Sequence, residues 1–427
     1  MARERKRQTR AAGVSDSRLV SVRSLPDPAT SDTEPTAKAC PSCGSPDLTV
    51  FHERKSVPVH SCRLVATRDE AIASPCGALR LALCASCGFI TNTAHNPALL
   101  DYGIDYEETQ GFSPLFRDFM GRLARRWVER HELYDKDILE IGCGKGEFLA
   151  LLCELGGNRG VGIDPAFVEG RLESGASDRI VFIRELYGEN HADLATDALV
   201  CRHTLEHIAQ VGDFLALIRR TAGRRGATAV LFEVPDVMRV LRERAFWDIY
   251  YEHCSYFSAG SLARLFRRTG FRVVALERGY DDQYLVVDAY PGEDDGLRPL
   301  AIEESSAAIA DEAAAFSRSV SSTIARWRDR LVAARADGKR IAVWGAGSKA
   351  VSFLTSLELQ DEVACAVDIN PYKRGRFLAG TGHRVVAPED LLDQPPDLVV
   401  AMNCVYVDEI RADLVRLGAG GVEVEAL

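Results

Sequence analysis

The sequence predicts a multidomain α/β protein whose main part is a doubly wound, largely parallel sheet. Its 427 residues exceed what one hydrophobic core usually serves, so two or three domains are expected. Short apolar runs alternate with amphipathic stretches from about residue 137 to about residue 290, the pattern of successive βαβ units. A second βαβ pattern begins at Arg340 and continues to the end of the chain. We therefore expect two α/β domains, the second smaller than the first.

The part of the chain before these domains divides into two. Residues 1–36 hold Ser, Thr, Pro and alternating charges with few apolar groups, so they are expected to form a disordered tail. Residues 37–100 are expected to form a compact, loop-rich module, which contains six of the twelve cysteines. Apolar residues then recur at helical spacing and predict a helix over residues 114–131; they are Phe116, Phe119, Met120, Leu123 and Trp127.

The first α/β domain is assigned to residues 101–295. Residues 137–146 are expected to form a strand, a glycine loop and the start of a helix. Further strands are expected at 160–164, 198–201, 227–234 and 271–276, and helices at 211–219 and 261–268. Residues 301–336 are rich in Ala, Glu and Arg with almost no Gly or Pro, so they predict a long helix within a connecting segment at 296–336. The second α/β domain is assigned to residues 337–427, and its Rossmann-like pattern opens on a glycine turn.

Composition excludes several classes of function. No run approaches the ~20 apolar residues that cross a bilayer, so no membrane span is expected. The basic residues among the first ten are followed by no apolar stretch of a secretion signal, and the expected location is cytoplasmic. A net charge of −10 gives no long-range attraction for nucleic acid, which disfavours an RNA or DNA partner. A small-molecule substrate is expected, and the oligomeric state stays unknown.

Two Cys-x-x-Cys pairs predict a metal site. They are Cys40 with Cys43 and Cys84 with Cys87, and a glycine follows each pair directly. This spacing lets both thiolates of a pair reach one tetrahedral ion, and reduced cysteines are expected in the cytoplasm. Four thiolates leave no position for water, so a structural zinc ion is expected. The long segment between the pairs leaves other candidates for the fourth ligand, namely His52, Cys62 and Cys76.

The glycine loop after the first strand predicts a cofactor site. Glu140 ends the strand, and Gly142, Gly144 and Gly146 stand at alternate positions before a helix, where the backbone can approach a ligand closely. A dinucleotide loop has the form G-x-G-x-x-G, whereas G-x-G-x-G after Glu resembles the first motif of class I methyltransferases, which bind S-adenosylmethionine. Asp164 ends the next strand and can accept hydrogen bonds from ribose hydroxyls.

Further cofactor and catalytic candidates follow later strands. Arg202 and His203 lie where the adenine and the methionine tail would be held, and His207 lies at the same edge of the sheet. Methylation at carbon requires a base that removes a proton, usually next to a carbonyl, and a donor that stabilises the enolate. His253 stands beside Glu252 in an aromatic segment that excludes water, which suits proton abstraction. The stretch 102–114 is polar and aromatic, and is either a lid or a linker.

Together these motifs resemble the nucleotide-sugar C-methyltransferases, which add a methyl group at carbon 3 of a 4-keto deoxysugar. The resemblance runs from about residue 40 to the end and includes the cysteine pairs, residues 140–146, 206–208 and 250–253, and the C-terminal 345–349 and 368–373. It implies an N-terminal zinc-binding domain, a class I methyltransferase domain and a Rossmann-like C-terminal domain. It implies these catalytic residues: His253 as base, Tyr250 and Glu252 as its companions, and His207 and Tyr106 assisting.

The resemblance also implies that the C-terminal domain helps to hold the nucleotide of a nucleotide-sugar substrate. The residues suited to this are Gly345, Gly347, Lys349, Asp368 and Lys373, because a glycine turn and lysines favour phosphate. One segment departs from the family: residues 280–284 read Tyr-Asp-Asp-Gln-Tyr where the sugar enzymes commonly carry a Gly-Gly-Ser type of turn. The alternatives are therefore an O- or N-methyltransferase of another polar metabolite, or a binding protein that retains the cofactor fold without turnover.

Overall fold

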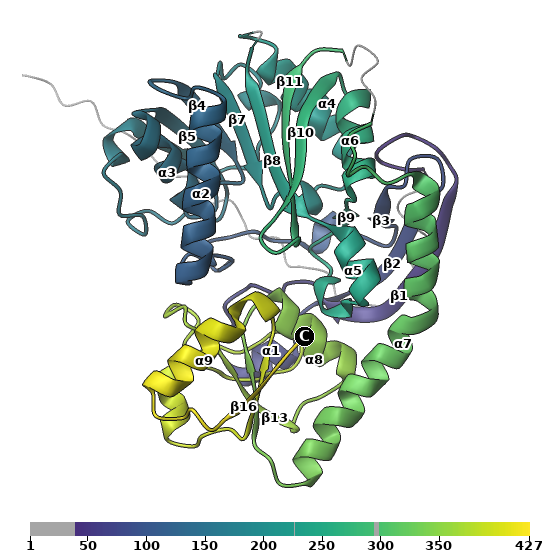
Figure 1. Ribbon diagram of the computed structural model, residues 1–427, viewed down its shortest axis with the longest axis vertical. Coiled ribbons are helices and arrows are strands. Elements are labelled where there is room, and N and C mark those ends of the chain that lie inside the picture. The colour runs from purple at the N-terminus through teal and green to yellow at the C-terminus, as the bar shows by residue number, and fades with distance from the viewer. Residues whose placement is uncertain (1–38, 226, 294–298) are drawn as a thin grey trace, which may run out of the picture. The chain divides into compact units, whose positions relative to one another are not determined.

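The computed structural model (Figure 1) describes residues 39–427 except residue 226 and residues 294–298. The disordered tail expected at residues 1–36 lies outside the described residues. The described part of the chain contains three sheets, of four, seven and five strands. Between the α-helices lie short 3-10 helices: η1 (Pro97–Leu99), η2 (Ser177–Arg179), η3 (Glu189–His191), η4 (Leu205–His207), η5 (Phe246–Asp248), η6 (Pro388–Leu392) and η7 (Cys404–Tyr406). None of the helices described is long and apolar enough to cross a bilayer.

The seven-stranded sheet forms the central domain, with strand order β10-β11-β8-β7-β4-β5-β6. Its strands are β4 (Asp137–Ile141), β5 (Arg159–Ile163), β6 (Ile180–Ile183), β7 (Ala198–Arg202), β8 (Ala229–Pro235), β10 (Phe271–Gly279) and β11 (Tyr284–Pro291). Strands β4 to β8 run parallel, and β11 is antiparallel to both β8 and β10. The doubly wound, mainly parallel sheet of the class I methyltransferase fold is confirmed.

Helices cover both faces of this sheet because neighbouring strand residues point to opposite sides. In β4, Ile138 belongs to the core with α2 (Pro114–Arg130) and α3 (Glu147–Gly156). Leu139 and Ile141 belong to the opposite core, which contains residues of two other helices, α4 (Val211–Ala222) and α6 (Ala259–Arg268). A shorter helix, α5 (Val237–Glu243), follows β8.

Helix α2 shows how the sequence sets an element boundary. The hydroxyl of Ser113 accepts a hydrogen bond from the Phe116 N–H at 3.2 Å, and Pro114 occupies the first turn, where its missing N–H is not needed. All five apolar residues that predicted this helix are buried. The helix ends at Arg130, one residue before the predicted end.

The N-terminal module is a sheet rather than the loop-rich stretch that we expected. Strands β1 (Leu48–Pro58), β2 (Cys76–Cys84) and β3 (Ile90–Asn92) are antiparallel, and β9 (Ser255–Tyr256) from the central domain completes the sheet. Helix α1 (Arg68–Ile72) lies between β1 and β2. Leu79, Leu81 and Leu83 alternate along β2 and are buried, which is a strand pattern that we missed.

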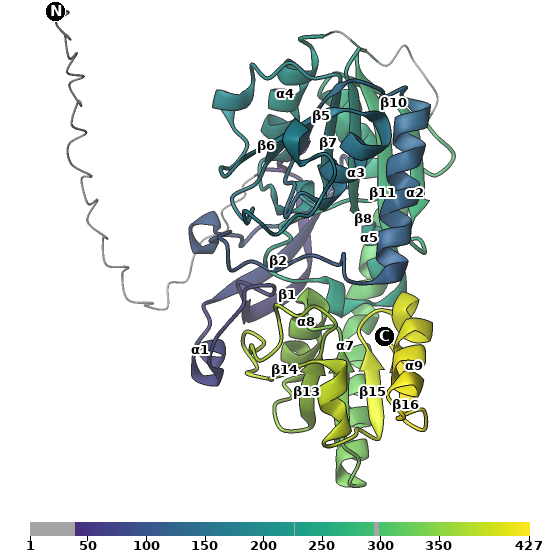
Figure 2. The same cartoon turned by 90° about the vertical axis from the view of Figure 1, so that its left-hand side faces the viewer.

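The C-terminal domain follows a long helix, α7 (Ser306–Ala336). This helix begins later than the predicted residue 301, because the Ser305 hydroxyl caps its first turn. The sheet of the domain has the order β14-β13-β12-β15-β16 and is parallel throughout (Figure 2). The elements are β12 (Ile341–Trp344), α8 (Ser348–Leu357), β13 (Val363–Val367), β14 (Val385–Val386), β15 (Leu398–Ala401), α9 (Val407–Arg416) and β16 (Glu423–Ala426). This agrees with the Rossmann-like pattern expected after residue 337.

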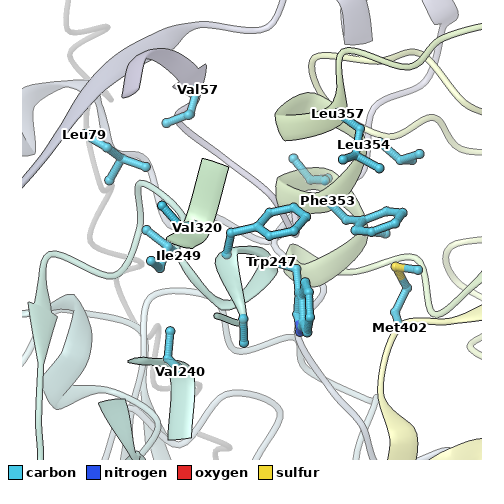
Figure 3. Packing of buried hydrophobic residues seen from close by; sticks show 14 of the residues in the cluster. Val57, Leu79, Val240, Trp247, Ile249, Val320, Phe353, Leu354, Leu357 and Met402 are labelled. Atoms are coloured by element: carbon cyan, nitrogen blue, oxygen red, sulfur yellow. The ribbon is translucent and has the colours of Figure 1, made fainter. Parts of the chain in front are cut away.

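One hydrophobic cluster joins all three parts of the described chain (Figure 3). Val57 and Leu79 come from the N-terminal module, and Trp247 and Ile249 from the segment after α5. Phe353 of α8 stacks on Phe246 and packs edge-on against Trp327 and Trp247. Burying these aromatic side chains stabilises each by roughly 1.5–3 kcal/mol, so the C-terminal domain is held firmly against the central one.

Candidate active site

A cavity of about 730 Å³ lies at the carboxyl edge of the central sheet and is closed on its other side by the C-terminal domain. This is the position where open α/β sheets bind ligands. It collects nearly all of the site residues predicted from the sequence. The lining includes Glu140, Gly142, Gly144, Asp164, Arg202, His203, His207, Tyr106, Tyr250, His253, Gly345, Gly347, Lys349, Asp368 and Lys373. Gly146 and Glu252 do not line it.

The glycine loop after β4 requires glycine for steric reasons that differ between positions. Gly142 has φ +69°, and a Cβ there would lie 1.9 Å from Thr204 Oγ1. Gly144 has φ +55°, and its Cβ would lie 2.7 Å from a carboxylate oxygen of Glu108. Gly146 has φ +84° and abuts the Phe182 ring, which explains why it packs the helix instead of lining the cavity. The loop is therefore confined from three sides and keeps its backbone open to the cavity.

Asp164 braces this loop. One carboxylate oxygen accepts the Gly144 N–H at 2.8 Å and the other accepts the Ala166 N–H at 2.7 Å. Each oxygen retains a lone pair that a ribose hydroxyl can use. Glu140 is buried beneath the loop, where burial raises its pKa to about 8, and one of its oxygens has no hydrogen-bond partner. An orphaned polar atom and a glycine cradle beside it fit a cofactor with polar groups.

The end of strand β7 holds a buried ion pair between two side chains. Arg202 Nε donates to Glu233 at 2.6 Å, and the Arg202 guanidinium lies 4.0 Å over the Phe148 ring. Arg202 thus has a partner within the protein besides its place in the cavity wall. His203 has φ +49°, a strained value for a residue with a side chain, and it packs edge-on to Tyr284.

Two histidines meet in the cavity. The ring centroids of His253 and His207 lie 4.9 Å apart with the rings nearly perpendicular, and the Tyr250 ring centroid lies 4.1 Å from that of His253. Burial, followed by the nearby His207 and His203, holds the pKa of His253 well below the ordinary value of 6.5. His253 is consequently neutral at physiological pH, which is the form that accepts a proton.

Three phenols surround this histidine pair. Tyr102 and His207 Nδ1 are hydrogen-bonded at 3.0 Å, and the Tyr102 ring packs edge-on to Tyr106. Burial raises the pKa of Tyr102, Tyr106 and Tyr250 well above 10, so all three stay protonated and can donate hydrogen bonds. Tyr102 was not among the predicted catalytic residues. The sequence feature that could have identified it is its position at the start of the polar and aromatic stretch before the helix at 114–131.

Glu252 is buried behind the cavity wall and does not line the cavity. Its carboxylate accepts hydrogen bonds from the backbone N–H (3.0 Å) and the hydroxyl of Ser61, and it lies 3.5 Å from His60. Both partners belong to the N-terminal module. In this arrangement Glu252, expected as a companion of His253, anchors the segment that carries His253.

The stretch 102–113 covers the cavity and contacts both α/β domains. Lys145 of the glycine loop donates to the Tyr106 carbonyl at 2.8 Å. Glu107 is buried and forms a two-pronged ion pair with Arg171 at 2.8 and 3.0 Å, while Asn370 of the C-terminal domain donates to it at 2.7 Å. Of the two possibilities left open, lid or linker, these contacts favour the lid.

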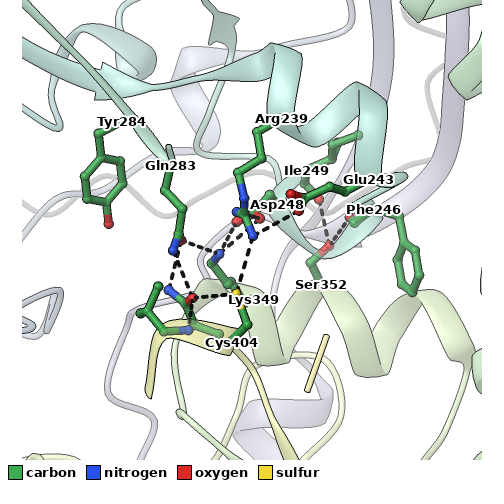
Figure 4. A network of polar contacts seen from close by, with 12 residues as sticks. Arg239, Glu243, Phe246, Asp248, Ile249, Gln283, Tyr284, Lys349, Ser352 and Cys404 are labelled. Atoms are coloured by element: carbon green, nitrogen blue, oxygen red, sulfur yellow. Dashed lines mark hydrogen bonds and ion pairs between the residues drawn. The ribbon is translucent and has the colours of Figure 1, made fainter. Parts of the chain in front are cut away.

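The C-terminal lysines are paired within the protein. Lys349 lies 3.0 Å from Asp248 and donates to Gln283 at 3.3 Å, in the network shown in Figure 4. Gln283 in turn exchanges two amide hydrogen bonds with Asn403, at 3.1 and 3.0 Å. The turn 280–284, where the sequence differs from the sugar enzymes, thus forms hydrogen bonds to the C-terminal domain. Three residues of this turn, Tyr280, Asp281 and Asp282, have positive φ.

Asp368 holds the second glycine turn in the way that Asp164 holds the first. It accepts the Ala346 N–H at 2.8 Å and pairs with Lys373 at 3.1 Å. Gly345 has φ +110° and Gly347 precedes α8, so the turn leads directly into a helix N-terminus at the cavity wall. Both α/β domains therefore present a glycine turn, braced by an aspartate, to the same cavity.

The four cysteines of the two predicted pairs lie together in the N-terminal module. Cys40 and Cys87 sulfurs are 3.7 Å apart and Cys43 and Cys84 sulfurs 3.5 Å apart, and all four lie within 4.8 Å of one another. The other candidates for a fourth ligand lie elsewhere: His52 packs against Phe316, Cys76 is exposed, and Cys62 contacts Ser348 beside the cavity.

Comparison with known proteins agrees with this geometry. A family model described as a methyltransferase domain matches residues 116–276, and a C-methyltransferase C-terminal domain matches residues 293–424. C-methyltransferase NovU of Streptomyces niveus is 27% identical over 390 residues, which cover 87% of this chain and 90% of that protein. Ribosomal protein L11 methyltransferase of Yersinia pseudotuberculosis is 24% identical over 113 residues, 26% of this chain and 39% of that protein.

Among solved structures, 1,6-didemethyltoxoflavin-N1-methyltransferase of Burkholderia thailandensis, with S-adenosylhomocysteine bound, is 19% identical with a TM-score of 0.31. The match covers 42% of this chain and 82% of that one. The family matches, together with the glycine loop and Asp164, make this chain an S-adenosylmethionine-dependent methyltransferase that carries the C-terminal domain of C-methyltransferases.

Proposed function

We propose that the chain is a C-methyltransferase acting on a nucleotide-linked keto-deoxysugar. The observation that carries the proposal is the neutral, buried imidazole of His253, which faces the cavity among protonated phenols. An oxygen or nitrogen atom that accepts the methyl group has its own lone pair and needs little activation. A carbon acceptor needs a base and a donor that stabilises the enolate. The match to the C-methyltransferase C-terminal domain supports the same reaction.

In the proposed mechanism His253 takes the proton from the carbon next to the ketone. The electron pair of that C–H bond passes into an enolate, and a phenol of Tyr106 or Tyr250 donates a hydrogen bond to its oxygen. When bound, S-adenosylmethionine would supply the methyl group to this nucleophilic carbon, with S-adenosylhomocysteine as the leaving group. Tyr102 orients His207 through its hydrogen bond, and the lid residues exclude water that would reprotonate the enolate.

The C-terminal turn is the proposed site for the nucleotide. Gly345, Gly347 and the N-terminus of α8 offer backbone N–H groups to a phosphate, and Lys349 offers a cation. Lys349 is balanced by Asp248 and Lys373 by Asp368. A diphosphate would therefore compete with these carboxylates for the lysines.

The direct test uses S-adenosylmethionine with a ¹³C-labelled methyl group and a thymidine diphosphate 4-keto-deoxysugar. We expect a product whose labelled methyl group is bonded to carbon in a two-dimensional NMR spectrum. A methyl group found on oxygen or nitrogen would overturn C-methylation, while leaving the methyltransferase assignment in place.

We expect Asp164→Ala to weaken S-adenosylmethionine binding by about tenfold or more, because a ribose hydroxyl and two loop N–H groups lose their acceptor. Isothermal titration calorimetry measures the effect. Asp164→Asn retains one acceptor oxygen and should lose less. Equal affinity of Asp164→Ala and wild type would assign the ribose contact to another residue.

We also propose that the four cysteines hold one structural zinc ion. A tetrahedral ion with thiolates at about 2.3 Å separates its sulfurs by about 3.8 Å, close to the 3.5 and 3.7 Å observed. We expect one zinc per chain by elemental analysis, and unfolding of the N-terminal module after its removal. Cys84→Ser should lower the zinc content and the melting temperature, whereas Cys76→Ser, at an exposed cysteine outside the cluster, should change neither. Metal-free protein purified without chelators would contradict the proposal.

A further inference from the structure

Glu206 is a buried carboxylate for which the proposed mechanism has no role. It lies in η4 at the cavity wall with 2% of its surface exposed, and neither of its carboxylate oxygens has a hydrogen-bond partner. Within the described residues its ion-pair contact is a long one, 3.7 Å to His203 Nδ1. Burying a carboxylate without a partner is costly, so a group that pairs with Glu206 is expected at this site.

The groups around Glu206 leave few candidates for that partner. Its carboxylate and ring nitrogens of His207 and His253 all lie within 4.8 Å of one another. Arg202, which also lines the cavity, is paired with Glu233. The remaining titratable neighbours are the phenols of Tyr102 and Tyr250 and the thiols of Cys201 and Cys254, and burial raises the pKa of each, so all stay neutral. Of the described groups near Glu206, the imidazoles of His203, His207 and His253 are those that can take up a proton and pair with it. His95 also lines the cavity, and burial, followed by the nearby His207, holds its pKa at about 4.

We propose that Glu206 is a positioning residue that stabilises the imidazolium formed when His253 takes the substrate proton, an inference that rests on the proposed function. Before that step His253 is neutral, and the buried carboxylate of Glu206 has no hydrogen-bond partner. After it, the new cation and the carboxylate lie a few ångströms apart. Because the carboxylate is already in place, little reorganisation is needed when the positive charge develops. His207, between Tyr102 and His253, lies where it can share or relay the proton.

The test is deuterium exchange in the presence of S-adenosylhomocysteine, which isolates proton removal from methyl transfer. The probe is a thymidine diphosphate 4-keto-deoxysugar that carries deuterium at carbon 3. We expect Glu206→Gln to lower the exchange rate about tenfold at neutral pH, because losing the negative charge makes the histidine pair a weaker base. For the same reason the acid limb of the pH–rate profile should move to lower pH. A purely structural role would not move that limb.

Two further variants complete the test. Glu206→Asp keeps the charge, so its acid limb should stay near that of wild type even if its rate or stability falls. Asp288→Asn removes a buried carboxylate that pairs with Arg130 and Trp127 on the other side of the sheet, and its profile should not shift.

If Glu206→Gln kept the wild-type exchange rate and pH–rate profile, the proposal for Glu206 would be overturned. Deuterium exchange by the wild-type protein would still support the proposed function. No exchange in wild type would instead overturn the proposed function. A second metal equivalent bound by wild type and lost in Glu206→Gln would show that the carboxylate's partner is a metal ion, and would also overturn the proposal.

Discussion

Replacing His253 with alanine is expected to lower the rate of methyl transfer about a hundredfold or more while the fold and cofactor binding persist. The loss follows from removal of a buried, neutral imidazole that lies against both Tyr250 and His207. Steady-state kinetics with a keto-deoxysugar nucleotide measure the rate, and calorimetry with S-adenosylhomocysteine measures the cofactor site separately.

Deuterium at the carbon to be methylated gives the sharper evidence. Wild-type protein should exchange it with solvent when S-adenosylhomocysteine replaces the methyl donor, and His253→Ala should not. If His253→Ala exchanged at the wild-type rate, His207 or Tyr106 would become the better candidate base and His253 would orient the sugar. His60→Gln tests the anchoring of this segment separately from proton removal, because His60 contacts Glu252 and lies outside the cavity lining.

Replacing Gly142 with alanine is expected to abolish measurable S-adenosylmethionine binding or weaken it by at least about tenfold. The residue has φ +69°, which costs a non-glycine residue about 1–2 kcal/mol, and its new Cβ would lie 1.9 Å from Thr204 Oγ1. The loop must therefore move, and with it the backbone that lines the cavity. Calorimetry measures affinity, and thermal unfolding measures the accompanying loss of stability.

Gly170→Ala is the matched control for this loop variant. Gly170 has a similar φ of +78° but nothing within 4 Å of an added Cβ, so it reports backbone strain alone. We expect its affinity for the cofactor to match wild type. If the two variants bound the cofactor equally well, crowding at Gly142 would not shape the site.

The local pattern of the sequence determined most of the fold. Strand β4, the glycine loop and α2 were predicted within a residue or two, because hydrophobic periodicity, a capping serine and glycines at positive φ are local properties of the chain. The N-terminal module shows where prediction from local sequence patterns failed. Its sheet is completed by β9, which lies far along the chain, and no local pattern reveals a partner so distant in sequence.

The sequence also determined which residue types the site would contain, since the Cys-x-x-Cys pairs, Asp164 and His253 could be named from spacing and resemblance. Only the tertiary structure decided their partners. Folding turns Glu252 toward Ser61 and the N-terminal module, brings Tyr102 to His207, and pairs Lys349 with Asp248 across two domains. It also buries Glu206 among three histidines. These outcomes depend on distances between segments far apart in the chain and on how deeply each group is removed from water, and both are set by packing.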